Sequence, residues 1–88
     1  MSIYRFPAMA NIGQFDTLEQ LKHIERELRE AYEANYYDER QAYGMELLDI
    51  IHATETALRM EFSQNEVEEL RARVIEKNSS RGYYEVTK

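Results

Sequence analysis

The chain has no cysteine among its 88 residues. A disulfide framework, a thiolate metal site and a cysteine nucleophile are therefore excluded. Long apolar runs are also absent, which predicts a protein without a membrane-spanning helix. The first residues, MSIYRFPAMANIG, lack the apolar stretch of a signal peptide, so we expect a soluble, cytoplasmic protein.

Basic residues are scarce, with 11 lysines and arginines against 17 aspartates and glutamates and a net charge of −6. A general nucleic-acid-binding protein needs a basic face, so this balance argues against that class. The charge is uneven, because residues 1–62 are mainly acidic and residues 70–88 are mainly basic. That asymmetry suits an anion bound through a metal ion, although charged helices also carry such residues simply to stay soluble.

Several motifs that mark enzyme classes are missing. The sequence has no glycine-rich phosphate loop, no G-x-S-x-G elbow and no H-E-x-x-H pair. No side chain stands out as a nucleophile. Any hydrolysis would therefore use water activated by a metal ion.

The spacing of apolar residues predicts an all-α protein with a single domain, residues 1–88. Pro7 and Gly13 indicate an irregular arm. Asp16 and Ser63 each precede a glutamate by three residues, which is the pattern of a capping box at a helix start. The expected elements are an arm at 1–15, helices at 16–35, 38–62 and 63–78, and a tail at 79–88.

The helix expected at 38–62 is long and has a broad apolar side, formed by Leu47, Leu48, Ile51, Leu58 and Phe62. One partner helix cannot cover that side. A chain of this length also buries only about 60–65% of the surface exposed in its unfolded form, so its own core is small. We therefore expect a homodimer or tetramer in which antiparallel long helices pair between subunits into a four-helix bundle.

Two pairs of acids carry the strongest functional signal. Glu27 and Glu30 lie three residues apart on one expected helix, and Glu46 and Asp49 lie three apart on the next. Residues at this spacing share a helix face, so two antiparallel helices could bring four carboxylates together. Converging negative charges are unfavourable without a cation, which favours a site for Mg²⁺, with Mn²⁺ as an alternative. The competing interpretation is a solvated acidic face.

Other polar residues leave alternatives open. His52 follows Asp49 by three residues, and paired Glu-x-x-His motifs build di-iron bundles. A second such motif is missing within the chain, although a dimer could supply it. His52 and His23 are also compatible with roles beside the metal ligands. Near the end of the third helix stands a group that could bind phosphate or simply cap the helix: Lys77, Asn78 and Arg81.

The acidic motifs, ExxE at 27–30 and ExxD at 46–49, are separated by residues 31–45. This arrangement resembles the signature of the MazG-like, all-α nucleoside-triphosphate pyrophosphatases. Ile24 before the first motif agrees with the resemblance, as does the ELLDII context of the second. The short length and the RGYY segment at 81–84 are similar to small MazG-like proteins of bacteria and their phages.

The resemblance implies an activity, namely Mg²⁺-dependent hydrolysis of a nucleoside triphosphate to the monophosphate and pyrophosphate. It implies that the metal is held by Glu27, Glu30, Glu46 and Asp49, and that catalysis depends on Glu27 and Glu30. It implies contacts with the substrate's phosphates or sugar by Lys77, Asn78 and Arg81. Electrostatic stabilisation of this kind supplies most of the rate in phosphoryl transfer.

One position departs from the family pattern. Arg26 stands where many members carry a further glutamate before the first motif. A positive charge there favours a second hypothesis, a nucleotide-binding protein of the same fold that does not turn its ligand over. A third hypothesis is a structural helical module whose acids only face solvent.

Overall fold

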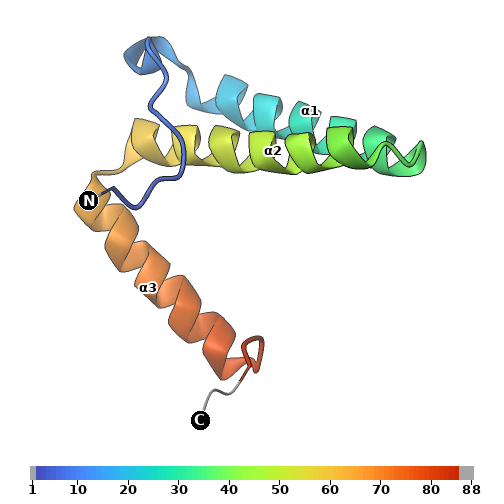
Figure 1. Ribbon diagram of the computed structural model, residues 1–88. Helices are drawn as coiled ribbons and strands as arrows, with labels where there is room; N and C mark the ends of the chain where they lie inside the picture. Colours follow the sequence, from blue (N-terminus) through green and yellow to red (C-terminus); the bar gives the residue numbers. More distant parts are fainter. Residues whose placement is uncertain (1, 86–88) are drawn as a thin grey trace.

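The computed structural model describes residues 2–85 and confirms the all-α fold class (Figure 1). It contains a short 3₁₀ turn, η1 (Ile12–Gln14), and three helices: α1 (Thr17–Tyr36), α2 (Arg40–Glu61) and α3 (Gln64–Ser80). Residues 2–85 contain no strand. Residues 86–88 of the expected tail lie outside the described part of the chain.

The helix starts follow from the caps. The side chain of Asp16 accepts a hydrogen bond of 3.1 Å from the Glu19 amide at the start of α1. At α3 the capping box is complete, because Ser63 accepts from the Glu66 amide and Glu66 accepts from the Ser63 amide. These bonds satisfy amides that the first helical turn leaves without partners.

All three helices differ from the expected ranges, 16–35, 38–62 and 63–78, by one or two residues at each end. Asp38 adopts a left-handed conformation with φ of 55°, which a helix cannot include, so α2 begins at Arg40 rather than at 38. The third helix extends to Ser80, two residues beyond the expected end at 78. Gly82, with φ of 75°, then ends it, and its amide donates to the Ser79 carbonyl.

Helices α1 and α2 form an antiparallel hairpin joined by a short turn (Figure 1). Small residues allow this close packing, since Ala31, Ala34 and Ala53 are buried. With Val67 of α3 they are the only buried apolar residues in the described chain. The hairpin therefore has a thin core of its own.

Helix α3 turns away from the hairpin after Ser63 and does not pack along α1 or α2 (Figure 1). Large apolar side chains consequently stay at least one third exposed on all three helices. They include Leu18, Leu21 and Leu28 of α1, Leu47, Leu48 and Ile51 of α2, and Leu70, Val74 and Ile75 of α3. A single chain thus leaves much of its apolar surface uncovered.

The helices of residues 2–85 include none that combines the length and the apolar character needed to cross a lipid bilayer. This agrees with the expectation that the sequence lacks a membrane span.

Candidate metal centre and adjoining cavity

The hairpin brings three carboxylates together near its middle. Glu27 comes from α1, and Glu46 and Asp49 come from successive turns of α2. One oxygen of each lies within 4.8 Å of the corresponding oxygens of the other two. This spacing is short enough for one cation to bind all three carboxylates, with modest side-chain movement.

Glu30, the fourth acid of the pattern, is exposed and lies outside this group of three. Its carboxylate still lies close enough to Glu46 to raise the pKa of that residue. The structure therefore gathers three acids and places the fourth at the edge of the group.

The pKa of Glu46 is raised from an ordinary 4.5 to about 7, mainly by burial and also by the neighbouring side chains of Glu27 and Glu30. The Oε2 atoms of Glu27 and Glu46 are buried, and neither has a hydrogen-bond donor within the described residues. A bound cation would satisfy these oxygens and remove the repulsion, so the donor set fits a hard metal ion.

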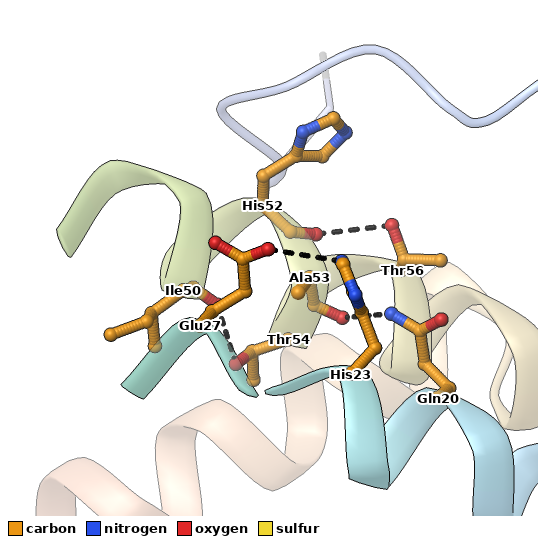
Figure 2. A network of polar contacts seen from close by, with 8 residues as sticks. All are labelled: Gln20, His23, Glu27, Ile50, His52, Ala53, Thr54 and Thr56. Atoms are coloured by element: carbon orange, nitrogen blue, oxygen red, sulfur yellow. Dashed lines mark hydrogen bonds and ion pairs between the residues drawn. The ribbon is translucent and has the colours of Figure 1, made fainter. Parts of the chain in front are cut away.

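The two histidines differ in their surroundings. His23 Nε2 lies 3.5 Å from Glu27 Oε1, so this histidine contacts one member of the acidic group (Figure 2). The His52 ring lies on the side of α2 that faces the N-terminal arm, where it stacks on Phe6 with ring centroids 4.8 Å apart. Within residues 2–85, the group of acids close enough to bind one metal ion includes neither histidine.

A cavity of about 620 Å³ adjoins the acidic group and shares Glu27 and Asp49 with it. Its other walls come from three elements: Met9 and Phe15 of the arm, His23 and Arg26 of α1, and His52 and Thr56 of α2. Among the described residues, Arg26 is the one lysine or arginine that lines it. Gln14, Asp16 and Glu19 also line it, so the cavity combines apolar and acidic side chains with the one cationic side chain of Arg26.

The expected phosphate-binding group lies elsewhere in the chain. Lys77, Asn78 and Arg81 stand at the C-terminal end of α3, and α3 diverges from the hairpin (Figure 1). The Asn78 carbonyl accepts the amides of Arg81 and Tyr83, which is ordinary helix termination. A single chain does not bring these three residues to the carboxylates.

Sequence patterns alone do not predict the surroundings of two residues, Arg26 and Glu55. Arg26 is singled out in the sequence only as a departure from the acidic motif, and no ion pair of Arg26 is found within residues 2–85. Glu55 is 9% exposed and binds the arm. The sequence position of Glu55 could have indicated a buried contact. The residue lies between Ile51 and Leu58 on the apolar side of the helix, where an acid needs a specific partner.

Comparisons with known proteins add no relative. A scan against protein-family models, a search of curated proteins and a search of solved structures each found no match. The functional argument therefore depends on the residues of this chain and their geometry.

The raised pKa of Glu46 predicts a stability that depends on pH in metal-free buffer. Below pH 4.5 the carboxyl is protonated in both the folded and the unfolded state. Between 4.5 and about 7 the folded state keeps a proton that the unfolded chain has lost, so the free energy of unfolding falls as pH rises. Urea denaturation with EDTA at pH 5 and pH 8 measures this fall.

The Glu46→Gln variant lacks the titrating group and should lose less unfolding free energy between the two pH values than the parent. Glu33→Gln, at an exposed position on α1, is the matched control and should behave as the parent does. An equal loss in all three proteins would contradict the assignment.

Proposed function

We propose that this protein is a Mg²⁺-dependent hydrolase that converts a nucleoside triphosphate to the monophosphate and pyrophosphate. The observation that carries the proposal is the group of Glu27, Glu46 and Asp49, whose oxygens lie within 4.8 Å of one another. Hard cations select oxygen ligands of this kind. The reaction class comes from the resemblance of the two acidic motifs to the MazG-like signature.

Bound Mg²⁺, or Mn²⁺ in its place, would neutralise the carboxylates and the phosphate charge and would polarise the scissile phosphate. The chain supplies the remaining chemistry. A water oxygen attacks the α-phosphorus, the bond from that phosphorus to the bridging oxygen breaks, and pyrophosphate leaves. Glu30, exposed beside Glu46, would orient that water and take its proton, with Glu27 as the alternative.

The adjoining cavity supports a ligand larger than an ion. Small-molecule sites usually enclose about 300–1,000 Å³, and the volume of about 620 Å³ falls in this range. We place the triphosphate at the carboxylate end and the rest of the nucleotide toward Met9 and Phe15. Arg26, beside Glu27, is then the side chain of the same subunit that binds a phosphate oxygen.

A second copy of the chain is part of the proposal. The apolar side chains on α1, α2 and α3 that a single chain leaves exposed need a partner of the same helical kind. Lys77, Asn78 and Arg81 lie away from the carboxylates of their own chain. In a homodimer or tetramer, α3 of one subunit would bring these residues to the acidic group of its neighbour.

Two other functions predict different behaviour. A nucleotide-binding protein without catalysis binds metal and nucleotide but releases no product, and the positive charge of Arg26 near the site favours it. A structural helical module responds to neither metal nor nucleotide.

Product analysis tests the reaction. The purified protein, incubated with Mg²⁺ and a panel of common and modified nucleoside triphosphates, should release monophosphate and pyrophosphate in equal amounts. Glu46→Gln should abolish turnover, because it removes a ligand charge, while Glu33→Gln should retain it. Nucleotide binding without product would reject catalysis in favour of the binding protein.

Arg26→Gln tests the phosphate contact. A hydrogen bond to a charged group contributes about 1.5–3 kcal/mol, so kcat/KM should fall about tenfold to a hundredfold. Arg29→Gln is the matched control, because Arg29 is on the same helix but does not line the cavity. Equal effects of the two substitutions would show that Arg26 has no specific contact and acts only through net charge.

Subunit mixing tests the shared site. Glu46→Gln and Lys77→Gln subunits are each expected to be impaired, since each lacks one half of the site. Random exchange between dimers restores both halves in about a quarter of the sites, so activity should reappear on mixing. Sedimentation should show a dimer or tetramer. Monomers in sedimentation, or no recovery of activity, would contradict a site built from two chains.

A further inference from the structure

The N-terminal arm is fastened to one face of α2 by three successive contacts. The Phe6 ring stacks on His52, with 18° between the ring planes. Next, the Glu55 carboxylate accepts the amides of Arg5 and Phe6 at 2.9 and 3.0 Å. Finally, the Arg59 guanidinium carbon lies 4.0 Å from the centre of the Tyr4 ring. The three α2 positions, 52, 55 and 59, follow helical spacing and form one stripe.

Glu55 is the central contact of this stripe. It is 9% exposed, and each carboxylate oxygen accepts one backbone amide from the arm. An ionised carboxylate is the side chain that can accept both amides, because an amide side chain would set its own donor against one of them. The contact therefore depends on the carboxylate of Glu55, whereas any residues except proline could supply the two arm amides.

The fastened segment leads directly into the cavity wall. Met9 and Phe15 follow it in the arm and line the cavity that contains Glu27 and Asp49. His52 joins the two features, since it stacks on Phe6 and lines the same cavity. Releasing residues 4–6 from α2 would therefore free one wall of the cavity without touching the carboxylate group.

We infer that Glu55 is a positioning residue that fastens the N-terminal arm as a wall of the nucleotide cavity. Binding of nucleotide and closure of the arm then stabilise each other. This inference rests on the proposed function for its ligand, while the attachment of the arm by Glu55 can be measured without any ligand.

The rate of cleavage by trypsin measures the attachment of the arm to α2. Trypsin cuts after Arg5, and the amide nitrogen of the Arg5–Phe6 bond is the Phe6 nitrogen that donates to Glu55. Cleavage thus requires the arm to leave α2. In Glu55→Gln the loss of the charged acceptor should raise the cleavage rate about tenfold, followed by intact mass.

The matched control is Glu61→Gln, the same substitution on the same helix at a residue that accepts from the Thr17 hydroxyl instead of from the arm. A second variant, Tyr4→Ala with Phe6→Ala, removes the two aromatic contacts of the arm with α2 and leaves the residues of the hairpin unchanged. It tests the attachment even if Glu55→Gln does not fold. It too should be cut faster than the parent.

Nucleotide binding is the second readout, with a panel of α,β-imido nucleoside triphosphates and Mg²⁺ as probes. The parent should be cut more slowly when a probe is bound. Glu55→Gln should bind that probe about tenfold more weakly, and its KM should rise with kcat little changed, because Glu55 orders a wall and does not touch the reacting atoms.

The trypsin and binding results distinguish the attachment of the arm from its role in nucleotide binding. Faster cleavage together with weaker binding supports the inference. Cleavage at the parent rate would overturn the attachment, and faster cleavage with unchanged binding would overturn the role of the arm as a wall. If the parent binds no probe, the nucleotide function fails and with it the role of the arm in binding, while the trypsin rates still decide whether Glu55 holds the arm.

Discussion

The repulsion between carboxylates across the α1–α2 hairpin is the constraint on which the rest of this structure depends. Glu27 and Glu46 face each other with one buried oxygen each that lacks a donor, and Asp49 adds a third negative group. The buried alanines let the two helices approach, and the raised pKa of Glu46 lets its carboxyl keep a proton to higher pH, which reduces the repulsion. A cation bound there, as proposed, would replace that proton and would couple metal binding to the stability of the hairpin.

Local signals predicted the helices well. Capping residues and apolar spacing act over a few residues, so the starts at Asp16 and Ser63 follow from the sequence alone. The short turn around Asp38 forces two helices into antiparallel contact, and this brings the ExxE and ExxD motifs to the same level. Three of the four acids meet for that reason, whereas Glu30 stays at the edge.

Contacts between distant segments were not predictable in the same way. The attachment of the arm depends on hydrogen bonds from two backbone amides to Glu55. Almost every residue has a backbone amide, so no sequence pattern predicts these bonds. Arg26 stands out in the sequence as a departure from the acidic motif, but only the structure places it in the cavity wall. The direction in which α3 leaves the hairpin was likewise not predictable, because the spacing of apolar residues does not show which helix surfaces pack together.

In a single chain the parts of the proposed site lie far from one another. Its acidic group and cavity lie on the hairpin, its basic residues lie at the far end of α3, and apolar side chains between them remain uncovered. The arm closes one side of the cavity from within the chain. A partner subunit would close another, which would tie ligand binding to both the arm and the assembly.

Titration of the parent with Mn²⁺, followed by electron paramagnetic resonance and compared with Glu46→Gln and Asp49→Asn, would determine whether the three carboxylates form a metal site. We expect saturable binding that is lost in both variants and displaced by Mg²⁺. Absence of binding to the folded parent, or binding that both substitutions leave unchanged, would contradict a metal site formed by Glu27, Glu46 and Asp49.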